Sequence, residues 1–175
     1  MSDFCAPRRV SGAVFACSAT YQSAPKQLDF SAAQNRKGNT AMIAFDLEAE
    51  QVFDPQKHVE KILETVSGGD VTVACWEPGQ VSPNHCHPDC TEIYFCWQGG
   101  GTMRTPDGEV LEVKPGSFVV HPPGEVHEYE NGPERSLLFR VRYGSDMAPR
   151  FVEWPSNPEF KQSAEDIAYF EANPT

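Results

Sequence analysis

Basic residues are scarce in this 175-residue sequence, which has 14 lysines and arginines against 25 aspartates and glutamates and a net charge of −11. An acidic surface repels phosphate backbones and anionic lipid headgroups. Long apolar runs are absent as well, since none approaches the ~20 residues that a membrane-spanning helix needs. We therefore expect neither a nucleic-acid partner nor a membrane partner, and the acidic balance is expected to serve solubility.

The six cysteines form neither a paired Cys-x-x-Cys zinc pattern nor a compact secreted scaffold. A chain of this length buries roughly 70% of its unfolded surface and needs no disulfide staples. Arg8-Arg9 precedes only a short, interrupted apolar stretch, which makes a poor signal peptide. Free thiols in a reducing, cytoplasmic location are therefore expected. The cysteines are Cys5, Cys17, Cys75, Cys86, Cys90 and Cys96.

The sequence shows no internal repeat and no low-complexity segment, and its length fits one domain. We expect three parts: an irregular N-terminal arm over residues 1–40, a β-barrel over 41–150, and a C-terminal extension with a short helix over 151–175. Residues 40–47 predict the first strand of the barrel.

Two segments predict helices outside the barrel. Asp54-Pro55 is typical of a helix start, and apolar residues then recur at helical spacing as far as Gly68-Gly69, which indicates an end. The tail over residues 157–173 predicts a second, short helix, because Ser163 and Asp166 resemble a capping box. The apolar positions of the first helix are Val59, Ile62, Leu63 and Val66.

Between about residue 69 and residue 143 the pattern changes to short segments rich in β-branched and aromatic residues. Turn signals built on proline and glycine separate them. Many short strands at this spacing predict an all-β fold, an antiparallel sandwich or barrel.

Two histidines lie one residue apart within this β-rich region. Residues i and i+2 of a strand share a face, so His85 and His87 point the same way, whereas Cys86 between them is expected to point to the opposite face. Glu92 starts the next predicted strand and can return beside the histidines. The complete pattern is Gly79, five residues, His85-x-His87, four residues, Glu92, six residues and Gly99.

A second pattern begins after a gap of 16 residues and supplies a third histidine. His127 follows a proline-rich turn on a later hairpin and can converge on the same point. Three imidazoles and one carboxylate can bind a divalent transition metal and leave positions open for chemistry. The complete pattern is Gly116, five residues, Pro122-x-Gly124, two residues, His127, three residues and Asn131.

Both patterns, complete over residues 79–131, resemble the two motifs of the cupins, in particular the small single-domain members. The resemblance implies an all-β double-stranded β-helix, the cupin jelly-roll barrel, and it implies that the protein forms a homodimer. Fe(II) is the favoured ion, with Mn(II), Ni(II), Co(II) and Zn(II) as alternatives. The metal ligands that the resemblance implies are His85, His87, Glu92 and His127.

The remaining two histidines are expected to lie outside the metal site. His121 ends a predicted strand just before a proline, and we place it around the ligands or at the surface. His58 falls on the predicted helix from residue 54, on its solvent side. Glu125, in the turn before His127, is expected to be exposed.

Strand alternation places further side chains near the predicted ligands. An inward arginine would hold a substrate carboxylate or phenolate, and an inward tyrosine would act as a proton donor or base. Core packing or a solvated charge is the alternative for each, since a bulge would change the strand phase. The candidates for chemistry are Tyr94, Tyr129, Arg104, Arg140 and Arg142.

The favoured hypothesis is a mononuclear Fe(II) dioxygenase that acts with O2 on a small oxygenated substrate, phenolic or diketone-like. One alternative is a redox-neutral lyase or isomerase that moves a proton, as in the dimethylsulfoniopropionate lyases. Another is a metal-dependent small-molecule binder without catalysis. An apolar wall with few acid–base groups would favour the dioxygenase, whereas two inward tyrosines or a carboxylate would favour the lyase.

Overall fold

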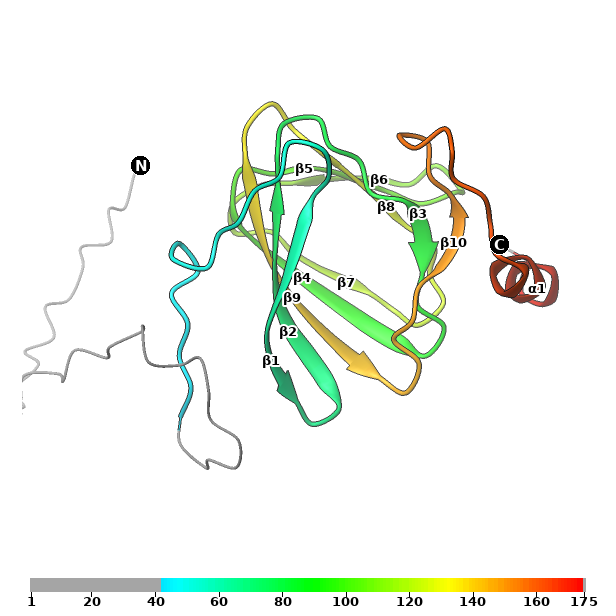
Figure 1. Cartoon of the computed structure of the whole chain (residues 1–175), viewed down its shortest axis with the longest axis horizontal. Coiled ribbons are helices and arrows are strands. Elements are labelled where there is room, and N and C mark those ends of the chain that lie inside the picture. The colour runs from blue at the N-terminus through cyan, green and yellow to red at the C-terminus, as the bar shows by residue number, and fades with distance from the viewer. Residues whose placement is uncertain (1–41, 175) are drawn as a thin grey trace, which may run out of the picture.

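The computed structural model describes residues 42–174, within which strands dominate and one short helix lies near the C-terminus (Figure 1). The arm predicted for residues 1–40 lies outside the described residues. The elements are β1 (Val59–Val66), β2 (Gly69–Trp76), β3 (Asn84–Cys86), β4 (Cys90–Gln98), β5 (Gly101–Arg104), β6 (Val110–Val113), β7 (Phe118–His121), β8 (Glu128–Asn131), β9 (Ser136–Gly144), β10 (Arg150–Glu153) and α1 (Ala164–Ala172).

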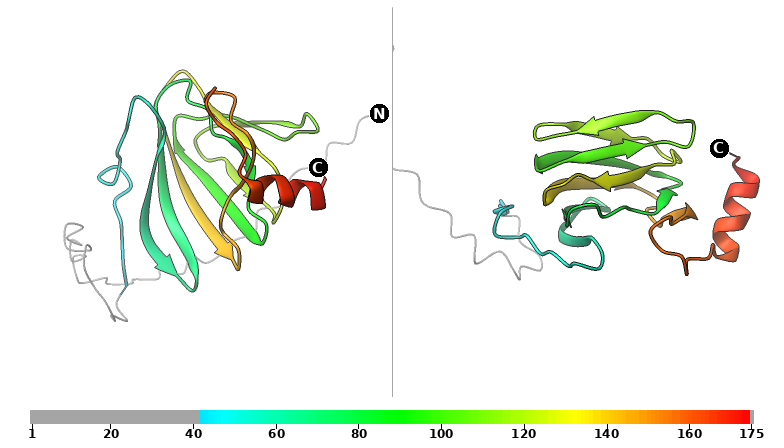
Figure 2. Two further views of the ribbon diagram at one scale, coloured as in Figure 1. Left: turned by 45° about the vertical axis from the view of Figure 1, so that its right-hand side comes forward. Right: turned by 90° about the horizontal axis from the view of Figure 1, so that it is seen from above.

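The strands form two layers that roll around a common centre (Figures 1 and 2). One layer is a five-stranded antiparallel sheet in the order β1-β2-β9-β4-β7. The other layer contains the three-stranded sheet β6-β5-β8 and the two-stranded pair β10-β3. Isolated β-bridges at His85↔His127 and Val81↔Glu130 connect the pair with the sheet. This arrangement confirms the predicted all-β jelly roll.

The register of the five-stranded sheet sorts the interior into a polar end and an apolar end. Residues directly opposite each other in antiparallel strands share a face. One inward row therefore contains Asp70, Arg142, Glu92 and His121. The next contains Thr72, Arg140, Tyr94 and Val119. Deeper in the barrel the core is apolar, with Ala74, Trp76, Cys96, Met103, Val113, Tyr129 and Leu138.

The helix predicted from residue 54 is wrong, because strand β1 occupies most of that segment. β1 pairs along its length with β2, and tertiary pairing outweighs the marginal stability of a short helix. Ser67 and Gly68 have φ values of 50° and 84°, and they link Val66 to its partner Gly69. Two positive φ values in a two-residue loop are typical of a type I′ hairpin, so the supposed helix end is a hairpin turn.

The strand predicted for residues 40–47 is wrong within the described residues 42–47, which contain no strand. A turn follows at Asp46, whose carbonyl accepts from Glu50 N and whose side chain accepts from Glu48 N. The edge position of the sheet is taken by β1 instead. The segment then packs on the barrel, with Phe53 lying under the Arg135 guanidinium at 4.6 Å.

The helix predicted in the tail is present as α1, shorter than the 157–173 range. It begins at the predicted capping box, in which Ser163 and Asp166 exchange hydrogen bonds. Asp166 Oδ1 also accepts from Phe151 N, which ties α1 to β10. Within the described residues no helix is long and apolar enough to cross a membrane.

The four cysteines within residues 42–174 are free and buried, namely Cys75, Cys86, Cys90 and Cys96. The Cys86 thiol faces Tyr169 on α1. It therefore points away from the barrel interior, as strand alternation predicted.

Candidate metal centre

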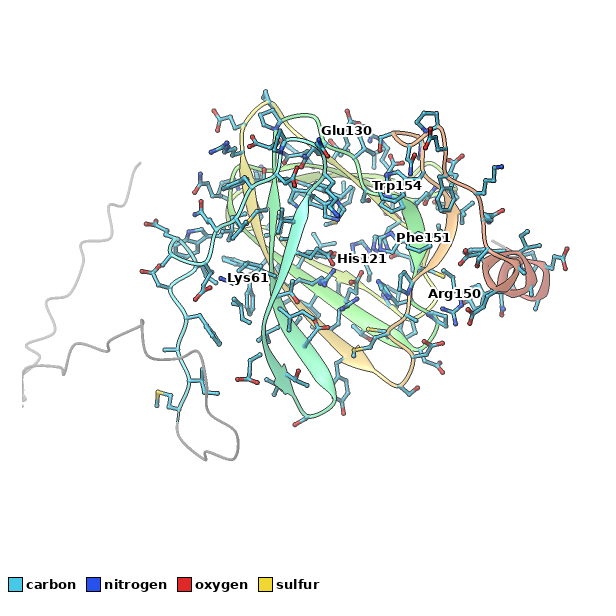
Figure 3. All side chains as sticks on the ribbon, viewed as in Figure 1. Lys61, His121, Glu130, Arg150, Phe151 and Trp154 are labelled. Carbon is cyan, nitrogen blue, oxygen red and sulfur yellow. The ribbon has the colours of Figure 1, made fainter. Side chains whose placement is uncertain are left out.

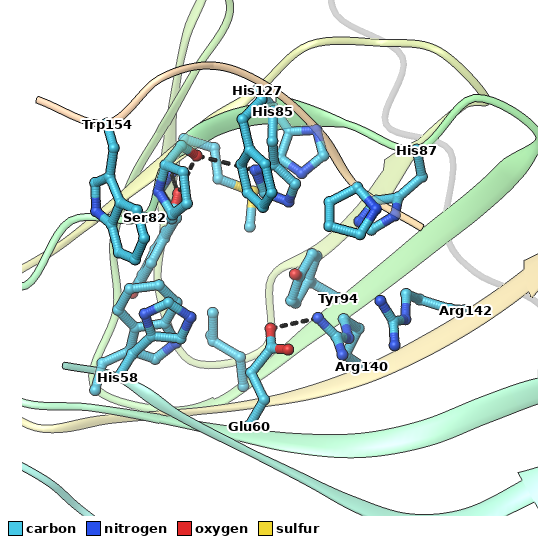
Figure 4. Close-up of a pocket in the computed structure, with 17 residues that line it drawn as sticks. His58, Glu60, Ser82, His85, His87, Tyr94, His127, Arg140, Arg142 and Trp154 are labelled. Carbon is cyan, nitrogen blue, oxygen red and sulfur yellow. Dashed lines mark hydrogen bonds and ion pairs between the residues drawn. The ribbon is translucent and has the colours of Figure 1, made fainter. Parts of the chain in front are cut away.

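The four predicted ligands come together at the polar end of the barrel, where Figure 4 labels the three histidines. His85 lies on β3 and Glu92 on β4, whereas His87 directly follows β3 and His127 directly precedes β8. His85 and His127 pair through two backbone hydrogen bonds of 3.0 and 2.9 Å. Glu92, on β4, faces two of the histidines: its Oε1 lies 3.3 Å from His87 Nε2 and its Oε2 lies 3.2 Å from His127 Nε2. One ligand atom from each of His85, Glu92 and His127 lies within 4.8 Å of the others.

The Nδ1 atoms of the three histidines all face acceptors, which fixes the tautomers. His85 Nδ1 lies 2.9 Å from Pro83 O, His87 Nδ1 lies 2.7 Å from Met147 O, and His127 Nδ1 lies 3.3 Å from Glu125 O. A carbonyl oxygen can only accept, so each Nδ1 carries a hydrogen, and in the neutral form of each ring Nε2 carries none. Each Nε2 then presents its lone pair, as metal-ligating histidines do.

The atoms that face the centre lack other partners. Glu92 Oε1 and Oε2, His87 Nε2 and His127 Nε2 are buried and form no hydrogen bond within residues 42–174. Buried polar atoms without partners are costly, and a divalent cation among them would remove that cost. Two ligand atoms about 2.1 Å from one metal ion and at right angles lie about 3 Å apart, close to the separations found here. The residues therefore fit a mononuclear metal ion.

Burial and charge set the pKa values of these groups. Burial lowers the pKa of His85 to about 3, and repulsion from His127 adds to this effect. Burial would also lower the pKa of His127, but the carboxylates of Glu125 and Glu92 outweigh burial and raise it to about 9. Burial opposes ionisation of Glu92, but His127, His87 and Arg140 hold its pKa well below the usual range. Glu92 is thus ionised and can serve as an anionic ligand.

A carboxylate that the sequence placed at the surface lies behind the ligands. Glu125 Oε2 is 2.6 Å from His121 Nδ1 and 3.5 Å from His127 Nδ1. Its side chain is 31% exposed, so Glu125 is part-buried rather than freely exposed as expected. Burial opposes its ionisation, but the two histidines lower its pKa to about 2. His121 is buried and its Nε2 lies 3.2 Å from Met103 Sδ. His121 thus lies next to the four predicted ligands and is not one of them, which agrees with the first of its two predicted positions, around the ligands or at the surface.

A cavity of about 220 Å³ adjoins the ligands. Its walls combine flat rings with a few polar groups (Figure 4). Two of its lining residues, His58 and Trp154, also line a neighbouring hollow of about 510 Å³, so the two spaces adjoin there. Figure 3 places Phe151 and Trp154 on the side of the barrel that carries β10. The lining includes His58, Glu60, Trp76, Ser82, Tyr94, Tyr129, Arg140, Arg142, Phe151 and Trp154.

The two predicted tyrosines reach the cavity in different ways. Tyr94 is buried beside Arg140, and burial, with repulsion from Glu92, raises its pKa far above the usual range. Tyr129 lines the cavity with its ring, but its hydroxyl donates to Asn131 Oδ1 at 3.0 Å. Burial raises the pKa of Tyr129 to about 12. The Tyr129 hydroxyl is therefore engaged in the barrel core.

The three predicted arginines separate into two inside the barrel and one outside. Arg140 lines the cavity and pairs with Glu60, and Arg142 lines it and pairs with Asp70 at 2.6 Å. Arg104 lies elsewhere. It pairs with Glu130 at 2.6 Å, its side chain is 38% exposed, and it does not line the cavity. The structure thus does not bring Arg104 to the predicted ligands.

Two cavity residues were missed in the sequence because a helix was predicted there. His58 stacks on Trp76 with ring centroids 4.0 Å apart, so its predicted solvent-facing position is wrong. Glu60, two residues along the chain, lines the same cavity and pairs with Arg140. Had this segment been predicted as a strand, the alternation of side chains at i and i+2 would have placed His58 and Glu60 on one face.

The sequence and fold are similar to those of known proteins. A family model described as "Cupin domain" matches residues 72–139. Gentisate 1,2 dioxygenase 1 of Aquipseudomonas alcaligenes is 32% identical over 62 residues, 35% of this chain and 18% of that protein. Glucose-6-phosphate isomerase of Thermococcus litoralis is 35% identical over 66 residues, 35% of each chain.

Among solved structures, the fold is similar to that of a conserved protein with a double-stranded beta-helix domain from Klebsiella pneumoniae. The TM-score is 0.59 at 21% identity, covering 65% of this chain and all of that one. This likeness supports the fold. The chain spans only about a fifth to a third of the length of the two curated relatives that it matches.

Proposed function

The chain belongs to the cupin superfamily, and from this premise and the geometry of its ligands we propose that it is a mononuclear metal-dependent enzyme, an Fe(II) dioxygenase that acts on a small oxygenated compound. The observation that carries the proposal is the convergence of three oriented Nε2 atoms and an ionised carboxylate whose oxygens lack other partners within the described chain. His85, His87, Glu92 and His127 would hold the ion.

An iron ion held there would supply Lewis acidity and a path for electrons between an oxygenated substrate and O2. Mn(II), Ni(II), Co(II) and Zn(II) suit the same donor set. Around it, the chain contributes geometry and the exclusion of water. Trp76, Phe151 and Trp154 form flat walls against which a ring can lie. Arg140 places a buried positive charge where an anionic oxygen would be oriented.

The partial relationship to a gentisate dioxygenase supports a phenolic substrate, and a diketone-like compound is the second type that we propose. A cavity of about 220 Å³ suits a single ring, since benzene occupies an apolar cavity of about 150 Å³. Tyr94 and Arg140 lie side by side in this space and would orient an anionic oxygen of the substrate by charge and hydrogen bonding.

Metal analysis followed by oxygen uptake tests this function. The purified protein, loaded anaerobically with Fe(II), would be given gentisate, catechol and acetylacetone, and oxygen consumption and ring or chain cleavage would be recorded. We expect stoichiometric uptake of O2 with at least one of these compounds. Metal content well below one ion per chain after loading would contradict the metal site itself.

A redox-neutral lyase or isomerase is the second candidate, because a tyrosine and a carboxylate line the cavity. Tyr94 and Glu60 both adjoin Arg140 and could carry a proton to and from a substrate carbon. The similarity to a sugar-phosphate isomerase points the same way. Turnover without oxygen uptake would favour this candidate over the dioxygenase. Metal-dependent binding without any turnover would leave a small-molecule binder.

We also propose a homodimer in a cytoplasmic setting. The outer face of β4 and β7 exposes Phe118, Val120 and Trp97, which a second copy would cover. The four free thiols of the described chain fit a reducing environment. Light scattering would show twice the chain mass for the dimer.

A further inference from the structure

The cavity contains a buried cation whose hydrogen-bonding capacity is only partly used. The Arg140 side chain is 2% exposed and lines the cavity. Its Nη1 pairs with Glu60 and lies 3.5 Å from Glu92 Oε1. Its Nε and Nη2 are buried without a hydrogen-bond partner in the part of the chain that the structure describes. Buried donors without acceptors are costly, so a ligand that supplied two acceptors would be favoured.

The two unused donors lie on the same edge of the guanidinium. Nε–H and the adjacent Nη2–H are parallel and spaced to meet the two oxygens of a carboxylate, which accepts such a pair in the bidentate manner. A phenolate or an enolate offers one oxygen and would satisfy one of them. The pattern of free donors therefore favours a carboxylate.

The other cation in the cavity has its own partner. Arg142 contacts Asp70 through Nη2 and Nε at 2.6 and 3.2 Å. Glu60 offsets Arg140 in the same way, and Glu92 would leave a divalent ion with one net positive charge. A cavity with this balance suits a substrate with a single negative charge.

The space around Arg140 limits the rest of the molecule. The cavity of about 220 Å³ takes a single ring or a short chain, and its walls present the faces and edges of His58, Trp76 and Phe151. The larger hollow adjoins this cavity at His58 and Trp154. A planar body in this cavity would thus lie beside Arg140 and the histidines that Figure 4 labels.

We propose that Arg140 determines substrate specificity, and that the substrate is a small monocarboxylic acid whose carboxylate binds Nε and Nη2 of this residue. The Tyr94 hydroxyl, beside the guanidinium, supports the same group. The inference rests on the proposed function for the reaction at the other end of the substrate, where a second oxygen atom of the substrate would face the metal.

Calorimetric titration with matched acid and amide pairs tests the proposal without any need for turnover. The pairs are acetate with acetamide, propanoate with propanamide, and benzoate with benzamide, each titrated into the metal-loaded and the metal-stripped protein. We expect at least one acid to bind about 10-fold or more tightly than its amide, because only the acid supplies the charge and both acceptors. Equal affinity within every pair would overturn the proposal.

Substitutions separate Arg140 from the general charge of the cavity. Arg140→Lys keeps the charge but removes the pair of parallel N–H donors. It should therefore weaken the binding of the preferred acid about 10-fold or more and leave the affinity for the amide unchanged. Arg135→Gln, a matched control at the surface, should change neither. Glu60→Gln removes the carboxylate that competes with the acid for Arg140, so the affinity for the acid should rise about 3-fold or more. An acid affinity that stays constant in both the Arg140→Lys and the Glu60→Gln proteins would contradict the assignment.

The two proposals fail separately. Arg140-dependent acid binding without metal-dependent turnover would support the carboxylate site and count against the enzyme. Metal-dependent turnover of neutral compounds, with no preference for acids, would support the enzyme and refute the role of Arg140.

Discussion

The imidazole of His121 lies flat against that of His127, with ring centroids 3.8 Å apart and planes 14° apart. The Glu125 carboxylate approaches the Nδ1 atoms of both rings. A proposed metal ligand is thus held by stacking on one side and by a carboxylate behind it. The support behind the ligands is therefore built from the same short segment, residues 121–127, that delivers the third histidine.

Glu125→Ala should weaken metal binding about 10-fold to 100-fold, because the groups that orient ligating histidines contribute that much to affinity. Competition with a chromophoric chelator measures the dissociation constant. Glu125→Gln retains an acceptor and should lose less. Glu109→Gln, at an exposed carboxylate, serves as the control. Equal affinities in all four proteins would show that Glu125 plays no part in orienting His127.

His85→Ala and His127→Ala should each abolish metal retention while the barrel stays folded, because each removes one of four ligands from a site near the end of the core. Metal content per chain after gel filtration is the measurement, with circular dichroism as the check on folding. His58→Ala is the matched control, since this ring stacks on Trp76 and should leave the metal content unchanged. About one ion per chain in both ligand variants would rule out the assignment.

Metal binding should release about one proton per chain at pH 7. Without an ion, carboxylates raise the pKa of His127 to about 9, so this ring is protonated at neutral pH and must lose its proton to coordinate. His85, with a pKa of about 3, is already neutral. The apparent affinity should rise about 10-fold per pH unit up to pH 9 and level off above it. An affinity independent of pH between 7 and 9 would contradict the raised pKa of His127.

The same pKa sets a pH dependence for the metal-free protein. A pKa raised in the folded state means that protonated His127 stabilises the fold. That contribution is complete below the unfolded pKa of about 6.5 and is lost as the pH rises through 9. The melting temperature of the stripped protein should therefore fall between pH 6.5 and 9. His127→Gln should flatten this slope.

Tyr94→Phe distinguishes the two candidate reactions. Under the lyase or isomerase mechanism its hydroxyl would move the proton, and turnover should fall about 100-fold or more. Under the dioxygenase mechanism the loss should stay below about 10-fold. Tyr129→Phe is the control, because its hydroxyl is bonded to Asn131 within the core. A 100-fold loss in Tyr129→Phe, with Tyr94→Phe unaffected, would reverse the assignment.

The positions of His85, His87, Glu92 and His127 could be predicted because strand alternation and short connections leave little freedom. Two histidines at i and i+2 must share a face, and a four-residue connection returns the chain beside them. What alternation could not show is the support behind the rings. Met147 and Glu125 reach the histidines from a loop and a turn, where no period fixes the direction of a group.

The sequence did not predict the part of the cavity formed by His58 and Glu60, because the segment that contains them fits both a helix and a strand. Val59, Ile62, Leu63 and Val66 satisfy a helical period, yet the partner strand β2 decides the outcome by pairing along the whole segment. Such pairing is a tertiary effect that no local pattern contains. The error removed His58 and Glu60 from the predicted site.

Alternation also explains the one arginine that lies apart. Neighbouring residues of a strand face opposite ways, and on β5 it is Met103 that is buried. Arg104 must then point outward, where Glu128 and Glu130 meet it. Arg140 and Arg142, two residues apart, do share the inner face as predicted.

The hydrogen bond between His87 Nδ1 and Met147 O joins groups 60 residues apart in the chain. Because binding free energies are reciprocal, an ion that fixes the ring of His87 must also stiffen the connection between β9 and β10, and slackening that connection must loosen the ion. Proteolysis of residues 145–149 would thus report occupancy from outside the barrel. Binding of the metal ion would then determine how firmly the segment after β9 is held against the barrel.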